Sequence, residues 1–215
     1  MNDLEKLFYE GKHRITARYP HYFEIYDKHF SKFRNLDMCM VELGIGYGGC
    51  LQIWKNYFGP KAKIYGADNA LQSFPEDQIE LIYCRADQRE SMAELRQKLP
   101  PIDILLDDCS HISSHQIIAF EELFPHLKDY GIYMVEDVYT SYAEPYEGGY
   151  KKEGSFIEYI KNLIDLNNLG TEMPITSFIQ YFKQIRGVYF YSGIVVIEKG
   201  PRNVCDPVRT GNNGL

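Results

Sequence analysis

The sequence predicts an α/β fold with a mostly parallel, seven-stranded sheet, and three observations support this prediction. Short apolar runs alternate with longer amphipathic stretches, which is the pattern of strands joined by helical crossovers. A glycine-rich turn, GIGYGG at 44–49, follows the first apolar run. The last two apolar runs are joined by Tyr191-Ser192-Gly193, which leaves no room for a helix. These two runs therefore form a hairpin, and one of them must be antiparallel.

The individual elements are expected in alternating order. The strands are the apolar runs at 38–43, 63–67, 79–84, 102–106 and 131–136, and then the hairpin runs at 186–191 and 193–198. The helices are the stretches at 48–57, 88–98, 113–127, 154–168 and 174–183. Because parallel strands are joined by right-handed crossovers, this order places helices on both faces of one sheet.

The chain divides into three parts. Residues 1–35 are expected to be helical, with a break near Pro20, and to cover the functional site. Residues 36–200 form the α/β domain, which is long enough to bury a full core. Residues 201–215 form a polar tail that is either mobile or used in subunit contacts, and we expect a homo-oligomer.

Composition and charge limit the partners and the location of the protein. The net charge of -7 argues against nucleic acid and anionic membranes as partners. No stretch approaches the roughly 18 apolar residues of a membrane span, and the opening residues MNDLEKLFYEGKHR do not form a signal peptide. The five cysteines are scattered and contain no C-x-x-C pair, so we expect reduced thiols in a cytoplasmic protein.

The segment VELGIGYGG at 41–49 is the most informative part of the chain. A buried strand that meets alternating glycines and then a helix lets the backbone approach a ligand closely and offers it free N–H groups. Gly44, Gly46 and Gly49 also match the dinucleotide pattern G-x-G-x-x-G, and Asp68 follows about 20 residues later, where a ribose-binding acid belongs. Spacing alone therefore allows NAD as the ligand.

Glu42, two residues before the first glycine, favours a different ligand. A carboxylate at this position would face the two phosphate charges of NAD, and the neighbouring sequence offers no counter-ion. S-adenosylmethionine has no phosphate and carries an ammonium and a sulfonium group. The sequence therefore favours S-adenosylmethionine over NAD.

Two further strands end in acidic pairs. Asp107 and Asp108 follow the apolar run IDILL, and Glu136 and Asp137 follow GIYMV. Neighbouring strands lie about 5 Å apart, and ligands of open α/β sheets bind beyond their carboxyl ends. If the two runs are neighbouring parallel strands, their four carboxylates converge at the edge that also holds the glycine turn.

Four converging carboxylates repel one another unless some are protonated or a cation lies among them. Because all are oxygen ligands, with no thiolate at metal spacing, Mg²⁺ or Mn²⁺ is favoured over Zn²⁺. His111 follows the strand end in a loop that can aim it at a substrate, and His115 lies one helical turn further on. Either histidine can instead be a cap or a hydrogen-bonded core ring. Asp108, His111 and His115 could also form an iron site, but this leaves Glu136 and Asp137 without a role.

Several segments together resemble a known family. They are VELGIGYGGCLQIWKNYFGPKAKIYGADN, DILLDDCSH, GIYMVEDVYTSY and EGGYKKEGSFIEYIKNLID, with RYPHYFEIYDKHF near the start. Their order and spacing are similar to those of class I, S-adenosylmethionine- and Mg²⁺-dependent sugar O-methyltransferases. The resemblance covers roughly residues 12–199. It implies the Rossmann-like class I methyltransferase fold and methylation of a hydroxyl on a glycoside, polysaccharide or natural-product sugar.

The resemblance also implies roles for individual residues. It implies that Asp108, Glu136 and Asp137 bind the metal ion and that His111 is the general base. It implies contacts to the cofactor from nine residues: Glu42, Gly44, Gly46, Tyr47, Gly48, Asp68, Asn69, Asp87 and Asp107.

The segment 138–152 follows the second acidic pair directly and is expected to cover the site as a lid that holds the sugar. It contains four tyrosines that can stack on a sugar ring and a Gly148-Gly149 pair that can act as a hinge. His21 and Tyr22 would close the other side. The tyrosines are Tyr139, Tyr142, Tyr146 and Tyr150. The alternative is a surface loop with its tyrosines packed beneath it.

Three other classes of function remain open. An NAD-dependent sugar oxidoreductase fits the glycines but not Glu42. A metal-dependent oxygenase of the cephalosporin hydroxylase type would share the D-x-x-H motif. A non-catalytic cofactor-binding subunit would keep the glycine turn but would need neither the acids nor His111.

Overall fold

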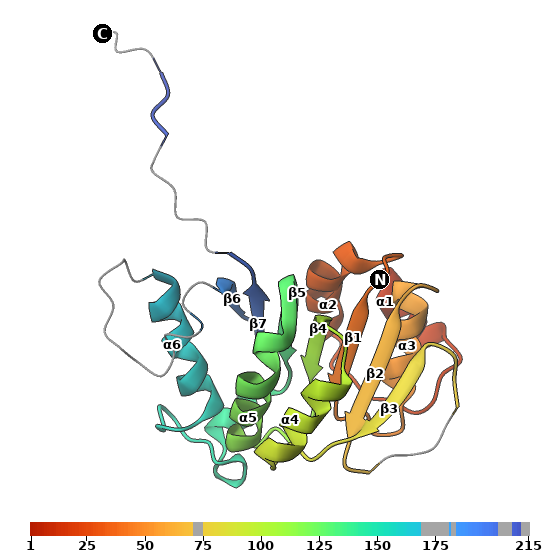
Figure 1. The fold of residues 1–215 in the computed structure, drawn as a ribbon, viewed down its shortest axis with the longest axis horizontal. Helices are drawn as coiled ribbons and strands as arrows, with labels where there is room; N and C mark the ends of the chain where they lie inside the picture. The colour runs from red at the N-terminus through yellow and green to blue at the C-terminus, as the bar shows by residue number, and fades with distance from the viewer. Residues whose placement is uncertain (71–74, 169–180, 182–183, 202–207, 212–215) are drawn as a thin grey trace.

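A seven-stranded sheet in the order β3-β2-β1-β4-β5-β7-β6 forms the centre of the molecule (Figure 1). The structure, a computed structural model, describes residues 1–70, 75–168, 181, 184–201 and 208–211. The first five strands pair in parallel, and β7 is antiparallel to both of its neighbours, β5 and β6. This arrangement confirms the predicted mostly parallel sheet with a C-terminal antiparallel hairpin. The strands are β1 Cys39–Leu43, β2 Lys63–Asp68, β3 Ile79–Tyr83, β4 Ile102–Asp107, β5 Leu127–Val135, β6 Ile185–Phe190 and β7 Val195–Lys199.

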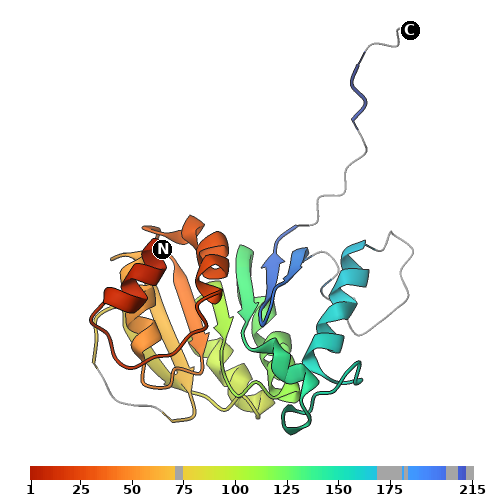
Figure 2. The same ribbon diagram turned by 180° about the vertical axis from the view of Figure 1, so that it is seen from behind.

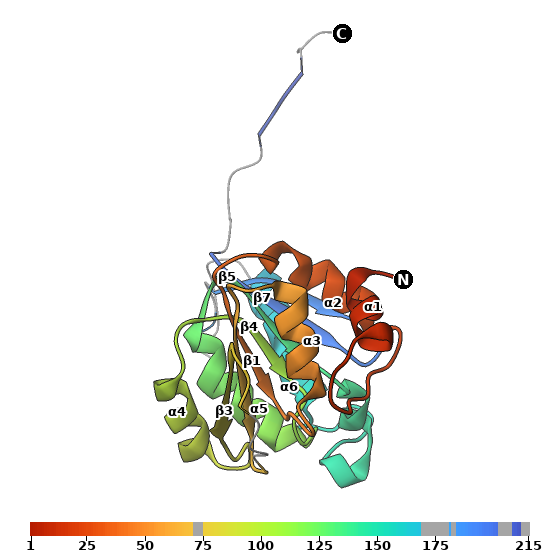
Figure 3. The same cartoon turned by 90° about the vertical axis from the view of Figure 1, so that its right-hand side faces the viewer.

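Helices cover both faces of the sheet, as Figures 2 and 3 show. Successive strand residues point to opposite faces, so the sheet contributes to two cores. Val41 packs in the core beneath α4, α5 and α6, whereas its neighbour Met40 packs in the core beneath α1, α2 and α3. The helices are α1 Asp3–Glu10, α2 Tyr22–Phe30, α3 Gly49–Phe58, α4 Arg89–Lys98, α5 Ser113–Leu123 and α6 Phe156–Asn168.

The predicted helix at 113–127 is shorter in the structure, and the next strand is longer. α5 ends at Leu123, a short 3₁₀ turn follows at Phe124–His126, and β5 begins at Leu127. Pro125 lies in that turn and has no N–H with which to continue an α-helix. The ammonium group of Lys199 donates to the carbonyls of Pro125 and Leu127, at 2.7 Å each, and holds the turn against β7.

The break in the N-terminal segment is wider than the sequence indicated. α1 begins at a capping box formed by Asn2 and Glu5. The chain leaves this helix at Gly11 and enters α2 only at Tyr22, so residues 11–21, here called the strap, lie outside both helices. The backbone N–H of Arg14 in the strap donates to Gln52 Oε1 of α3 at 2.8 Å.

Two predicted regions lie wholly or partly outside the described residues. The helix expected at 174–183 lies outside the described residues except for Tyr181, and much of the 201–215 tail does also. Among the helices that the structure does describe, none combines the length and the apolar character needed to cross a membrane.

Candidate active site

The carboxyl ends of β1, β4 and β5 meet at one edge of the sheet. The parallel register places Leu43 beside Asp107 and Asp107 beside Val135. Backbone hydrogen bonds continue past the strand ends, because Asp108 N–H donates to the Leu43 carbonyl at 3.0 Å and Glu136 N–H donates to the Asp107 carbonyl at 2.9 Å. The glycine turn and the two acidic pairs therefore start from the same edge, as the sequence predicts for neighbouring parallel strands.

The glycine turn packs directly against the loop that follows β4. Gly44 has a φ of +82°, and a Cβ atom at this position would lie 2.2 Å from the Asp108 carbonyl oxygen. Gly48 is also left-handed, with a φ of 80°, where the chain enters α3. Asp68 at the end of β2 stabilises the turn, because its Oδ2 accepts the Ile45 N–H at 2.9 Å. A side chain at Gly44 would force the turn and the β4 loop apart.

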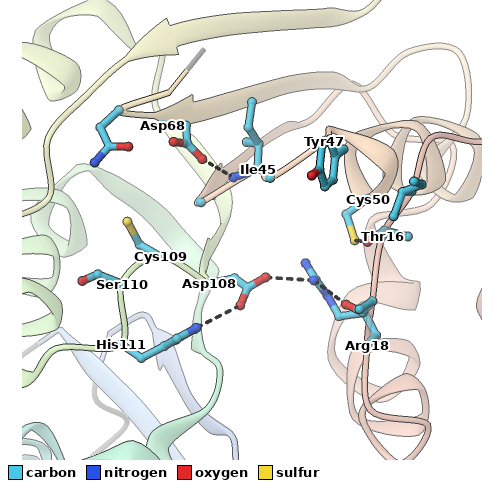
Figure 4. A pocket seen from close by; sticks show the side chains of 15 residues that line it. Thr16, Arg18, Ile45, Tyr47, Cys50, Asp68, Asp108, Cys109, Ser110 and His111 are labelled. Atoms are coloured by element: carbon cyan, nitrogen blue, oxygen red, sulfur yellow. Dashed lines mark hydrogen bonds and ion pairs between the residues drawn. The ribbon is translucent and has the colours of Figure 1, made fainter. Parts of the chain in front are cut away.

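Two cavities lie beyond these strand ends. The larger has a volume of about 540 Å³, and Figure 4 shows its lining. The smaller has a volume of about 270 Å³. Both are lined by Ala17, Arg18 and Asp108, so the two cavities adjoin one another there. Five of the residues predicted to contact a cofactor line the larger cavity: Gly44, Gly46, Tyr47, Asp68 and Asn69.

Four other residues predicted to contact a cofactor do not line either cavity. Glu42 is fully buried behind the strap. Gly48 lies at the N-terminus of α3. Asp87 forms a two-point ion pair with Arg85, at 2.6 and 3.1 Å. Asp107 accepts a hydrogen bond from Tyr133 at 3.0 Å, within the core beneath α4–α6.

The cluster of carboxylates expected from the sequence therefore contains Glu42 in place of Asp107. Asp107 and Asp108 are consecutive along an extended chain, so their side chains point to opposite faces. Asp108 and Glu136 face the strap, and Asp137 faces a tyrosine of α2. Asp107 faces the opposite core. Glu42 takes the fourth place, because it shares an ion-pair partner with Asp108 and Glu136.

That partner is Arg18 of the strap, a residue that the sequence analysis did not single out. Its guanidinium lies 2.6 Å from Glu42 Oε1, 2.8 Å from Asp108 Oδ2 and 3.5 Å from Glu136 Oε1. The Arg18 side chain is only 10% exposed. The sequence offered little sign of this role, because an isolated arginine among aromatic residues follows no pattern that connects it with a functional site.

Two tyrosines on α2 hold the second acidic pair. Tyr22 donates to Asp137 Oδ1 at 2.8 Å, and Tyr26 donates to Glu136 Oε1 at 2.5 Å. The two tyrosines lie four residues apart, so they occupy the same face of the helix. Tyr22 was expected at the site from the sequence, and the i, i+4 spacing in YFEIY was the signal that could have located Tyr26 as well. α2 thus fixes the positions of both carboxylates.

His111 lines the larger cavity, Asp137 lines the smaller one, and the two side chains approach one another. His111 Nε2 lies 3.8 Å from Asp108 Oδ1 and 3.6 Å from Asp137 Oδ2. His111 and Asp137 both have a positive φ, 58° and 54°, in the left-handed region that non-glycine residues rarely adopt. Such backbone strain is concentrated at functional sites in proteins.

The side chains of Asp108, His111 and Asp137 could hold a metal ion together. One ligand atom from each lies within 4.8 Å of the others. Two carboxylates and an imidazole nitrogen are a donor set that suits a divalent cation. Glu136 is not in this group, and neither is His115, whose Nδ1 is 2.7 Å from Ser110 Oγ. The structure therefore does not bring His115 to the iron site considered from the sequence.

Burial dominates the electrostatics of this cluster. It raises the pKa of Glu42 and of Asp108 to about 7 and the pKa of Glu136 to about 8, although Arg18 opposes each shift. One guanidinium therefore does not compensate the charge of these buried carboxylates. Burial lowers the pKa of His111, so its imidazole is neutral near pH 7 and able to accept a proton.

Curated relatives of the chain are methyltransferases that act on sugars. No protein-family model matches the chain. It is 36% identical over 164 residues to an 8-demethyl-8-α-L-rhamnosyl tetracenomycin-C 2'-O-methyltransferase from Streptomyces olivaceus, a match that covers 72% of this chain and 41% of the relative. It is 31% identical over 196 residues to the mycinamicin VI 2''-O-methyltransferase from Micromonospora griseorubida, covering 84% of this chain and 47% of the relative. The chain thus spans about half the length of the curated relatives it matches.

The fold of the chain is also similar to that of a solved methyltransferase structure. A methyltransferase of the mycinamycin biosynthetic pathway, in complex with Mg, S-adenosylhomocysteine and mycinamycin VI, superposes with a TM-score of 0.84 at 30% sequence identity. The match covers 94% of this chain and 54% of that protein. Both the fold and the sequence therefore point to one group of enzymes.

Proposed function

The chain is related in sequence and fold to the class I sugar O-methyltransferases, and on this premise we propose that it transfers a methyl group from S-adenosylmethionine to a sugar hydroxyl, assisted by Mg²⁺ or Mn²⁺. The relatives named above methylate sugar hydroxyls, and the related solved structure holds Mg and S-adenosylhomocysteine.

One observation carries this proposal: two cavities meet at Asp108. The larger is lined by the glycine turn and Asp68, which suits a donor with a ribose and an amino-acid end. The smaller is lined by the exposed Tyr19, and a sugar ring can stack on an aromatic side chain of this kind. A methyl group that leaves a donor in the first cavity can therefore reach a hydroxyl oxygen in the second.

The residues at the junction supply the chemistry of the transfer. In this mechanism His111 Nε2 takes the proton of the sugar hydroxyl while the hydroxyl oxygen forms its bond to the methyl carbon, and the carbon–sulfur bond of the donor breaks. A divalent cation bound by carboxylates here lowers the pKa of the hydroxyl. We assign cation binding to Asp108, Glu136 and Asp137. Asp137 is oriented for this by Tyr22, and Glu136 by Tyr26.

The test of this function is an acceptor screen with the purified protein, S-adenosylmethionine and Mg²⁺. We expect S-adenosylhomocysteine to form with rhamnosyl or other deoxysugar glycosides, and no turnover when NAD replaces the methyl donor. Methylation of catechols with no sugar accepted would contradict the sugar assignment. Tight binding of NAD with no response to S-adenosylmethionine would contradict the function as a whole.

Neutralising Glu42 is expected to weaken donor binding. Glu42→Gln keeps the size of the side chain but removes a buried carboxylate that lies behind Arg18 of the cavity lining. The ammonium and sulfonium groups of the donor would favour the ionised form of this carboxylate, whose pKa burial raises to about 7. A charge-assisted interaction contributes roughly 1.5–3 kcal/mol, so we expect the dissociation constant of S-adenosylhomocysteine to rise by about 10- to 100-fold. Isothermal titration calorimetry measures this change.

The matched control for this measurement is Glu80→Gln on β3. It removes the same charge from an exposed position on the same sheet. Equal affinities in Glu42→Gln and the wild-type protein would show that Glu42 does not support the donor.

We assign the binding of the sugar acceptor to the lid segment 138–152, and the contact that supports this comes from Tyr139. The hydroxyl group of Tyr139 lies 3.2 Å from that of Tyr19, which lines the smaller cavity. We expect Tyr139→Ala to raise the KM for the sugar and to leave donor affinity unchanged, because the contact is on the acceptor side only. Tyr150→Ala is the control, since Tyr150 is 81% exposed. Steady-state kinetics with a fixed donor concentration would refute the assignment if KM did not change in Tyr139→Ala.

Gly148 and Gly149, predicted to act as a hinge, make close packing contacts within the lid segment. A Cβ atom at Gly148 would lie 2.4 Å from the Ser141 carbonyl carbon, so this glycine permits close packing within the lid segment. The N–H of Gly149 donates to the Ser141 carbonyl at 2.9 Å. Both glycines thus hold the segment together in this conformation.

We also propose that the protein is a cytoplasmic homo-oligomer with reduced thiols, made of the three parts predicted from the sequence. The reduced thiols are supported by the described cysteines, Cys39, Cys50, Cys84 and Cys109, which are free, three of them buried. Size-exclusion chromatography with light scattering tests the oligomeric state, and a monomer would refute it.

A further inference from the structure

Arg18 connects carboxylates that come from three adjacent strands. Glu42 belongs to β1, Asp108 directly follows β4, and Glu136 directly follows β5. Each of these carboxylates lies within 3.5 Å of the Arg18 guanidinium. Arg18 itself comes from the strap, far from all three in sequence, and is almost completely buried. One planar cation therefore joins the ends of the strands that build the site.

The guanidinium is committed to protein groups. Nη1 donates to the Ala17 carbonyl at 2.9 Å and lies 2.8 Å from Asp108 Oδ2, and Nη2 donates to Glu42 Oε1 at 2.6 Å. Nε faces Glu136 at 3.5 Å. Arg18 also lines both cavities, and its Nε makes no hydrogen bond to the described residues. Its Nη1 and Nη2 are both held by carboxylates, so the geometry indicates a role through the acids.

Asp108 shows what this orientation achieves. Its Oδ2 faces Arg18, while its Oδ1 faces His111 on the other side (Figure 4). Arg18 thus holds one oxygen of Asp108, and the other oxygen is the one that faces His111. On the other side of Arg18, Glu42 Oε1 is held, and the buried Glu42 Oε2 has no hydrogen-bond partner among the described residues.

We propose that Arg18 is a positioning residue shared by the donor and cation sites. It orients Glu42 for the methyl donor and Asp108 and Glu136 for the divalent cation. A single substitution at Arg18 therefore weakens the binding of two ligands that occupy different places. This inference rests on the proposed function, because it needs both ligands.

The experiment titrates each ligand separately into the complete chain. Arg18→Met keeps much of the length of the side chain and removes the charge and all of its hydrogen bonds. We expect the dissociation constants of S-adenosylhomocysteine, measured without metal, and of Mn²⁺, measured without donor, each to rise by about 10- to 100-fold, as is typical when a partner that orients metal ligands is lost. Arg18→Lys restores the charge but not the fork of N–H groups, so we expect intermediate affinities for both ligands.

The matched control is Arg14→Met in the same strap. Arg14 forms an ion pair with Glu76 at 3.2 Å, away from the acidic cluster, so its loss removes one arginine from the strap without affecting the site. We expect wild-type affinities for both ligands. Thermal unfolding of each ligand-free variant, followed by circular dichroism, shows which variants are folded.

The outcomes separate this inference from the proposed function. If the wild-type protein binds neither ligand, the proposed function fails. If it binds both, and folded Arg18→Met binds either one with wild-type affinity, Arg18 is not shared and the inference is wrong. If Arg18→Met does not fold, Arg18→Lys decides: wild-type affinity for either ligand in that variant overturns the inference, and weakened binding of both supports it.

Discussion

Replacing His111 with asparagine is expected to lower kcat by about 10²- to 10⁴-fold, the usual contribution of a general base. The neutral imidazole next to Asp108 and Asp137 is the group placed to accept the hydroxyl proton. Asparagine cannot accept that proton, but it tolerates the left-handed backbone at this position better than alanine does. Single-turnover rates with saturating sugar measure the loss. The affinity for S-adenosylhomocysteine should stay within about twofold of wild type, because His111 lines the larger cavity as a neutral ring and asparagine is also neutral.

His115→Asn is the control for this experiment. His115 lies on α5 one turn further on and bonds to Ser110, so its replacement should change kcat little. An equal or larger loss in His115→Asn, with little loss in His111→Asn, would transfer the role of base to His115. A Mn²⁺ titration of His111→Asn separates the two possible roles of His111, because weakened metal binding would make it a ligand as well.

Removing divalent cations is expected to abolish turnover, and adding Mg²⁺ or Mn²⁺ should restore it. Asp108 and Asp137 place carboxylate oxygens close to one another and to His111, and a divalent cation there would favour the ionised form of Asp108, whose pKa burial raises. We expect Asp137→Asn to raise the dissociation constant of Mn²⁺ by more than the roughly 10- to 100-fold that loss of an outer partner costs. Full activity in the presence of a chelator would refute a metal-assisted reaction.

The Mn²⁺ titration also includes a control variant, Asp103→Asn, and a variant of the third predicted ligand, Glu136→Gln. Asp103→Asn lies in β4 near its amino end, where Asp103 Oδ2 accepts from Lys128 Nζ at 2.7 Å, so Mn²⁺ affinity should be unchanged. Glu136→Gln tests the remaining predicted ligand, because glutamine still accepts the hydrogen bond from Tyr26. A dissociation constant equal to that of wild type in Glu136→Gln would limit the cation site to Asp108, Asp137 and His111.

The fold could be predicted because its signals are local in the sequence. Strand periodicity, crossover length and the short hairpin connection of VYFYSGIVVIEKG are properties of neighbouring residues, and they predicted the parallel sheet and its antiparallel end. The helix predicted at 113–127 was too long because it ignored Pro125, a local signal that the α-helix ends. The 3₁₀ turn that replaces its end is also stabilised by Lys199, which lies 72–75 residues away along the chain.

The candidate site divides in the same way. The sequence by itself determined the glycine turn, the acids at the ends of β4 and β5, and His111, because strand order and register bring strand ends together without any detail of side-chain packing. Only the tertiary structure decided that Asp107 faces the opposite core, that Glu42 joins Asp108 and Glu136, and that Arg18 holds all three. The physical reason is that a buried charge requires a partner, and the strap that supplies this partner reaches the site through contacts that leave no pattern in the sequence.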